Sequence, residues 1–212
     1  MLSILQAAGW PVWPLLLCSV LALALIIERS ISLRTRRVAP PDLLDEVRAV
    51  AQLGPPERSA VDRLAAHSAL GKVLASALYA WLERPQLGES DLRAAVETCG
   101  RQVAHELERY LSALATIASA APLLGLLGTV VGMIEIFASQ SQSGAGNPAQ
   151  MAQGISIALY NTAFGLMVAL PALVAWRHFR TRVDGLILAI ELAAEGLVRH
   201  VLAQRELPGA AP

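Results

Sequence analysis

The sequence is poor in charge: 16% of its 212 residues are Asp, Glu, Lys or Arg, while 55% are hydrophobic. Soluble globular domains carry roughly a quarter charged residues, so part of this chain is expected to lie in a solvent other than water. Neither lysine nor arginine occurs from Met1 to Glu28. Because a secretory signal peptide opens with a basic region, we expect the first hydrophobic segment to stay in the mature protein.

Cysteine and the familiar catalytic motifs are scarce as well. Cys18 and Cys99 have no metal-ligand spacing around them, which predicts two small buried apolar residues rather than a disulfide or a metal site. His105 and Glu106 begin a string like the HExxH zinc motif, but Arg109 stands where its second histidine is required. The sequence has no Gly-x-Ser-x-Gly elbow and no phosphate-binding loop. We therefore expect neither an enzyme nor a cofactor.

Three uncharged apolar segments are long enough to cross a bilayer, whose core needs about 20 helical residues. They cover residues 12–27, with a possible outward extension through Trp10, then 111–134 and 151–176. Arginines gather on one side of these segments only, which places the N-terminus outside and the C-terminus in the cytoplasm.

The predicted fold is an all-α membrane protein with three transmembrane helices and long cytoplasmic helical extensions. Its expected parts are a periplasmic N-terminus with the first transmembrane helix (1–28), a cytoplasmic helical loop (29–109), the second transmembrane helix (110–137), a short periplasmic loop (138–150), the third transmembrane helix (151–176) and a cytoplasmic C-terminal helix (177–212).

The cytoplasmic parts are predicted to be helical. Residues 42–52 and 59–82 each favour a helix, and an apolar face at 73–82 is expected to pack on neighbouring helices, with a ligand pocket as the alternative. From Ser90 an apolar stripe runs into the second span with no helix breaker before Pro122, which predicts one continuous helix. A second stripe at 183–202 has no evident cover within the chain, so both stripes favour oligomerisation.

The second and third spans each carry a stripe of small residues, which permits close helix approach in lipid. Thr129 and Thr162 lie in these stripes, near the middle of antiparallel spans. Each hydroxyl could bond a carbonyl of its own helix, or the two could border a narrow polar path. The positions expected to serve helix packing are Gly125, Gly128, Gly132, Gly154, Gly165, Pro122 and Pro171.

Longer stretches of these spans carry a family resemblance. The run APLLGLLGTVVGMI at 121–134 resembles the second-span signature of the ExbB/TolQ/MotA proton-channel family. The run GISIALYNTAFGL at 154–166, followed by ALPA at 169–172, resembles its third-span signature. The opening GWPVWPL at 9–15, through Glu28 and Arg29, resembles the short form of ExbB.

The resemblance implies a homopentamer around a central pore in the lipid bilayer of the bacterial inner membrane. That pore would hold the span of an ExbD- or TolR-like partner with a titrating aspartate, and the partner would pass force to a TonB- or TolA-like protein. Thr129 and Thr162 match family threonines that line the pore beside this aspartate. The implied function is the channel subunit of a proton-driven motor that energises TonB-dependent outer-membrane transport. A TolQ-like subunit of a Tol-Pal envelope-constriction system is the alternative, and a nucleic-acid partner is not expected.

Two polar residues of the spans depart from, or add to, the family pattern. The third-span signature often carries a glutamate where this chain has Ile157, and Glu135 in the second span lies at a similar depth. Glu135 is hypothesised to supply that carboxylate, and the alternative is an interfacial glutamate in contact with outside water. Asn161 is expected either to form a hydrogen bond between subunits or to line the pore weakly.

Overall fold

The computed structural model describes residues 10–52, 54, 56–84, 86, 88–143 and 148–206. Within these ranges all regular structure is α-helical, as predicted, and no strand occurs. The predicted N-terminal stretch before Trp10, the centre of the 138–150 loop and residues 207–212 lie outside the described part. The chain divides into two compact units, residues 1–29 with 110–178 and residues 30–109 with 179–212, and each is described by itself.

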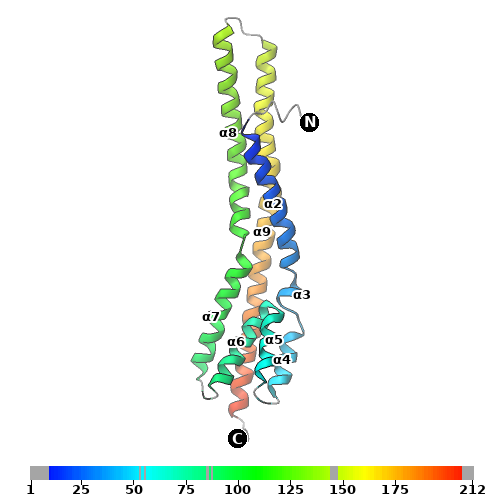
Figure 1. The fold of residues 1–212 in the computed structure, drawn as a ribbon, viewed down its shortest axis with the longest axis vertical. Coiled ribbons are helices and arrows are strands. Elements are labelled where there is room, and N and C mark those ends of the chain that lie inside the picture. Colours follow the sequence, from blue (N-terminus) through cyan, green and yellow to red (C-terminus); the bar gives the residue numbers. More distant parts are fainter. Residues whose placement is uncertain are drawn as a thin grey trace. The chain divides into compact units, whose positions relative to one another are not determined.

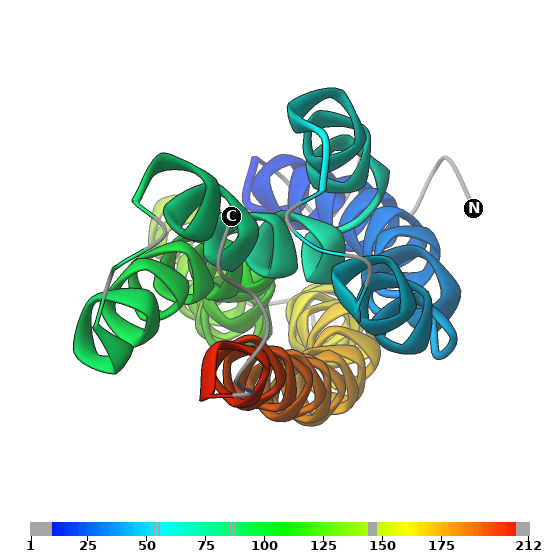
Figure 2. The ribbon, with the colours of Figure 1, turned by 90° about the horizontal axis from the view of Figure 1, so that it is seen from below.

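The first unit is formed by α2 (Val12–Ser32), α8 (Leu111–Ser143) and the first half of α9 (Pro148–Glu206). Within the described part of the chain, these three helices contain the segments that are long and apolar enough to cross a membrane. Figures 1 and 2 show α8 (green) and the yellow half of α9 side by side. Large apolar side chains are exposed along all three helices, which suits a lipid environment better than water. Exposed examples are Leu17, Leu23, Leu123, Ile134, Met167 and Val174.

The predicted continuous helix from Ser90 into the second span is wrong. Helix α7 (Glu89–Glu108) ends at Glu108, and α8 begins at Leu111 after a turn. Tyr110 in this turn has φ 69°, a left-handed conformation that side chains other than glycine seldom adopt. Its ring centroid lies 5.2 Å from the guanidinium carbon of Arg29, so a contact between distant segments accompanies the break. Arginine and tyrosine are both compatible with a helix, so the local sequence gives no sign of this turn.

Helical structure extends into the polar connection predicted between the second and third spans. Of the loop expected at 138–150, residues up to Ser143 belong to α8 and those from Pro148 belong to α9. Proline suits the first turn of a helix, because the amide hydrogen that it lacks would have no helical acceptor there. Pro122 and Pro171 also lie inside helices that continue past them, as membrane helices often allow.

The second unit packs short helices around α6 (Ala69–Glu83). Helices α3 (Thr35–Val38), α5 (Arg58–His67) and α7 contact α6, and the unit also includes α4 (Leu43–Gln52) and the end of α9. The single helix predicted at 59–82 is in fact two, because Ser68 has an extended backbone and its hydroxyl accepts the Gly71 N–H over 3.0 Å. This side-chain bond caps the start of α6. Pairing across the unit includes Lys72 and Glu106, whose charged atoms lie 2.7 Å apart.

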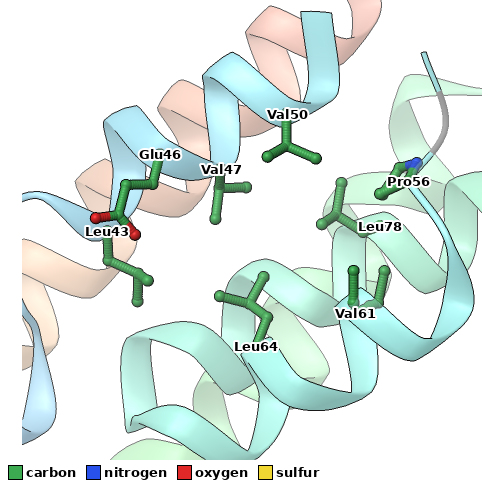
Figure 3. Close-up of a pocket in the computed structure, with 9 residues that line it drawn as sticks. Leu43, Glu46, Val47, Val50, Pro56, Val61, Leu64 and Leu78 are labelled. Carbon is green, nitrogen blue, oxygen red and sulfur yellow. The ribbon is translucent and has the colours of Figure 1, made fainter. Parts of the chain in front are cut away.

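The apolar face predicted at 73–82 is mostly buried, as expected for helix packing. Val73, Leu74, Ala77, Leu78 and Trp81 are each at most 7% exposed. A cavity of about 180 Å³ also lies next to this face, between α4, α5 and α6. Figure 3 shows its lining, which is aliphatic apart from the carboxylate of Glu46.

Candidate functional site

Small residues bring α8 and α9 into backbone contact in the first unit. A Cβ atom added to Gly125 would lie 2.8 Å from the carbonyl oxygen of Asn161 and 3.1 Å from the Cα of Thr162. One added to Gly165 would lie 2.6 Å from the carbonyl oxygen of Ala121. These gaps are too small for a methyl group, so Gly125 and Gly165 occupy the tightest part of the contact.

The same contact extends toward the α8–α9 connection. A Cβ on Gly132 would lie 3.3 Å from the Cβ of Ala158, and one on Gly154 would meet the side chain of Ile136. The residue pairs run in opposite directions along the two helices, so α8 and α9 are antiparallel and in register over at least four turns. In this register Thr162 lies opposite Gly125. Thr129 is four residues farther along α8, so the two threonines differ in depth by about 6 Å, or one helical turn.

Asn161 lies inside the contact. Its side chain is 1% exposed, and its amide nitrogen would lie 2.9 Å from a Cβ on Gly128. Gly128 thus leaves the space that the asparagine fills. Its two expected roles, between subunits or in the pore lining, stay predictions.

The hydroxyl groups of the two threonines have different partners. Thr129 Oγ1 donates to the carbonyl oxygen of Leu126 in its own helix, over 2.6 Å. Thr162 Oγ1 donates across the contact to the carbonyl oxygen of Gly125, over 3.3 Å. A hydroxyl has one proton to donate and two lone pairs that accept. Both threonines have therefore committed their protons to carbonyls, and each retains the capacity to accept.

Thr129 and Thr162 flank the α8–α9 contact on the same side. With 3.6 residues per turn, Thr129 lies about 70° round α8 from the line of contact glycines, and Thr162 lies about 80° round α9 in the same rotational sense. Since the helices are antiparallel, equal senses of rotation bring both residues to one side of the pair. Both side chains are partly exposed there. We call this side the threonine flank.

Glu135 and Ile157 lie on the other side of the pair. Glu135 is offset about 50° round α8, and Ile157 about 65° round α9, in the opposite sense to the threonines. Glu135 is exposed and Ile157 is partly exposed. Glu135 and Ile157 therefore lie on one flank, as is needed if Glu135 supplies the carboxylate that the family often carries at the position of Ile157. Neither residue lies on the threonine flank.

The sequence did not indicate two polar contacts near the ends of the membrane helices. Arg29 is 6% exposed, forms a salt bridge with Glu28 and lies over the ring of Tyr110. Arg182 Nε donates to the carbonyl oxygen of Leu33 over 2.7 Å. The charge pattern treats these two arginines alike, whereas in the fold Arg29 is buried and Arg182 is exposed. Among the described residues, no group of three or more His, Cys, Asp or Glu side chains is placed to hold a metal ion.

A profile of the MotA/TolQ/ExbB proton channel family matches residues 65–192, which include the α8–α9 contact and both threonines. The chain belongs to this family. It is accordingly a membrane protein of a proton-channel family, as its three apolar helices also indicate.

Individual relatives carry ExbB or TolQ names. The chain is 32% identical over 178 residues to a biopolymer transport protein ExbB-like 3 of Synechocystis sp., covering 83% of each chain. It is 32% identical over 170 residues to biopolymer transport protein exbB1 of Vibrio cholerae, covering 79% of this chain and 73% of the relative. It is also 40% identical over 82 residues to the Tol-Pal system protein TolQ of Pseudomonas aeruginosa, covering 39% and 36%.

Proposed function

We propose that this chain is the channel subunit of a proton-driven transport complex in the bacterial inner membrane, of the ExbB kind. Five copies would surround a pore, with the N-terminus periplasmic and the C-terminus cytoplasmic. The single-span ExbD-like partner in that pore would supply the titrating acid and act on a TonB-like protein. The observation that carries the proposal is the shared flank of Thr129 and Thr162.

The threonine flank suits a protonated carboxylic acid. Because both hydroxyl protons point to carbonyl oxygens, an incoming group meets hydroxyl lone pairs. A protonated acid can donate to them, whereas a carboxylate cannot. The flank would therefore favour the neutral form of the partner's acid inside the membrane and let it lose its proton where water begins.

The chain itself has no charged residue between Leu111 and Ile134 or between Met151 and Trp176. Without the partner's acid it should conduct protons poorly. With the partner, each proton that crosses 100 mV releases about 2.3 kcal/mol, enough to bias a two-state helix rearrangement.

Proton flux into vesicles that contain the chain and its partner tests this role. Replacing Thr162 with Val should reduce flux about fivefold to tenfold, the effect of losing one hydrogen bond of about 1 kcal/mol, and Thr162→Ser should restore most of it. Thr116→Val is the matched control, because Thr116 is exposed on α8 and its hydroxyl donates within the same helix, to the carbonyl oxygen of Ser112 over 2.9 Å. Equal flux in Thr162→Val and the wild type would refute the proposed pore lining.

Glu135 is proposed to supply the carboxylate that the family often carries at the position of Ile157. The two residues share a flank and a similar depth, which supports this exchange. Glu135→Gln should then lower flux, and Glu135→Gln combined with Ile157→Glu should recover it. If Glu135→Gln alone leaves motor function intact, Glu135 is an interfacial residue in contact with outside water.

Of the two candidate systems, we favour the one that energises TonB-dependent outer-membrane transport, because the relatives matched over most of the chain carry ExbB names. The TolQ relative supports the alternative of an envelope-constriction system. Co-expression with an ExbD-like and a TolR-like partner, followed by purification of this chain, distinguishes them. Preferential recovery of the TolR-like partner would favour the alternative.

A further inference from the structure

A basic segment without acidic residues follows the first membrane helix. Residues 29–41 include four arginines and neither Asp nor Glu. Arg29 is buried and paired with Glu28, whereas Arg34, Arg36 and Arg37 are exposed. Among the described residues, none of these three arginines takes part in a salt bridge. We call the three the arginine turn.

The backbone of the arginine turn is held in place. The N–H groups of Arg37 and Val38 donate to the carbonyl oxygen of Arg34 over 2.8 and 3.1 Å. Leu33, Val38 and Ala39 are buried around it, and α3 packs against α6. The Arg182 side chain bonds the Leu33 carbonyl oxygen just before the turn. The three guanidinium groups are thus carried on a fixed support.

The side chains of Arg36 and Arg37 point away from that support, and Arg34, which precedes α3, is exposed. Arg36 lies about 160° round the helical turn from the buried Val38, and Arg37 about 100° round from it. Five or fewer residues separate each arginine from Ser32, the last residue of α2. Chain connectivity therefore keeps the arginine turn near the end of the first span.

We propose that the arginine turn binds the phosphate groups of anionic phospholipids at the membrane surface. A guanidinium group presents paired donors that match phosphate oxygens, and no carboxylate of the segment competes for them. Arginines next to a span are attracted to an anionic leaflet, by about fivefold in occupancy for each side chain. The inference depends on α2 crossing the bilayer and is independent of proton conduction.

Native mass spectrometry of the full chain tests the lipid preference. The purified protein is mixed in detergent with equal amounts of phosphatidylglycerol and phosphatidylcholine, and the bound lipids are counted. The wild type should retain phosphatidylglycerol in preference. Replacing Arg34, Arg36 and Arg37 together with Gln should reduce this preference on the order of tenfold to a hundredfold. Replacing all three with Lys should preserve most of it.

A matched triple variant controls for total charge. Arg58, Arg63 and Arg84 are also exposed but lie far in sequence from every span, so their combined change to Gln should leave the preference unaltered. The proposal is overturned by an undiminished preference in the arginine-turn variant or by an equal loss in the control. Displacement of the lipid by inorganic phosphate would also overturn it, because the site would then bind soluble phosphate. If the Gln triple variant loses its helical circular dichroism, the Arg36→Gln variant is measured in its place.

Discussion

The hydroxyl of Thr162 donates a hydrogen bond to the backbone carbonyl oxygen of Gly125 on the neighbouring helix, over 3.3 Å. A carbonyl oxygen inside a helix already accepts one bond from its own helix, and it has a second lone pair for another donor. The absence of a side chain at Gly125 is what brings this carbonyl within reach of the threonine. The bond therefore depends on the glycine as much as on the hydroxyl.

Thr162→Val should lower the free energy of unfolding by about 0.5–1 kcal/mol, the range measured for hydrogen bonds between membrane helices. The valine keeps the shape of threonine, so little packing is lost. Thr129→Val removes only a bond within α8 and should have a smaller effect. Thermal unfolding in detergent provides the measurement, and an equal loss in both variants would contradict the interhelical bond.

Gly165→Ala should destabilise the first unit by about 1–3 kcal/mol, because its methyl group would meet the Ala121 carbonyl oxygen at 2.6 Å. Backbone atoms cannot move aside as the tip of a side chain can. Gly185→Ala is the control in the same helix, since a Cβ there has nothing within 4 Å. That change should be neutral or stabilise by up to about 1 kcal/mol, through higher helix propensity. Melting temperatures that move together would refute the proposed contact.

Gly71→Ala and Gly100→Ala make a similar pair in the second unit. A Cβ on Gly71 would overlap the carbonyl oxygen of Leu64 in α5, whereas a Cβ on Gly100 has nothing within 4 Å. The first change should destabilise by about 1–3 kcal/mol, and the second should stabilise by up to about 1 kcal/mol. Urea denaturation followed by circular dichroism checks both signs.

Tyr79 should titrate above its ordinary pKa of 10.0, because its phenol donates a hydrogen bond to the carboxylate of Asp62, which also repels the tyrosinate charge. Raising the folded-state pKa favours the protonated phenol. The hydrogen bond between Tyr79 and Asp62 therefore stabilises the folded state below pH 10.0, and this contribution is lost as pH rises through the folded-state pKa of Tyr79. Asp62→Asn should lower the pKa of Tyr79, as followed by tyrosinate absorbance against a Tyr79→Phe reference. An unchanged titration would contradict the bond.

Hydrophobic length was sufficient to predict the three apolar helices, because about 20 uncharged residues in a row have few alternatives to a membrane span. The glycine stripes were likewise visible from spacing, since helical periodicity gathers Gly125, Gly128 and Gly132 on one face. The break at Arg109 and Tyr110 was not predictable in this way. It accompanies a contact between Tyr110 and Arg29, which are distant in sequence.

Details of the candidate site needed coordinates as well. The sequence could place Thr129 and Thr162 near the middle of the spans. Which side of the helix pair they share depends on which glycines contact which backbone atoms. The threonines also differ in their hydrogen bonds. Thr129 donates to a carbonyl oxygen of its own helix, α8, whereas Thr162 donates from α9 to a carbonyl oxygen of α8. Arg36 and Arg29 looked alike in the charge pattern, yet Arg29 is buried and Arg36 is exposed.

The closeness of Gly125 and Gly165 restricts how the membrane helices can move. Sliding α9 by one turn along α8 would bring Ala169 to the place of Gly165, where only 2.6 Å separates an added methyl carbon from the Ala121 carbonyl oxygen. At Gly125 and Gly165 the atoms that meet belong to the backbone, so no change of side-chain rotamer could absorb such a shift. Helix α8 and the first half of α9 should therefore move together as one rigid body, so any rearrangement within the first unit must occur at the outer faces of the pair.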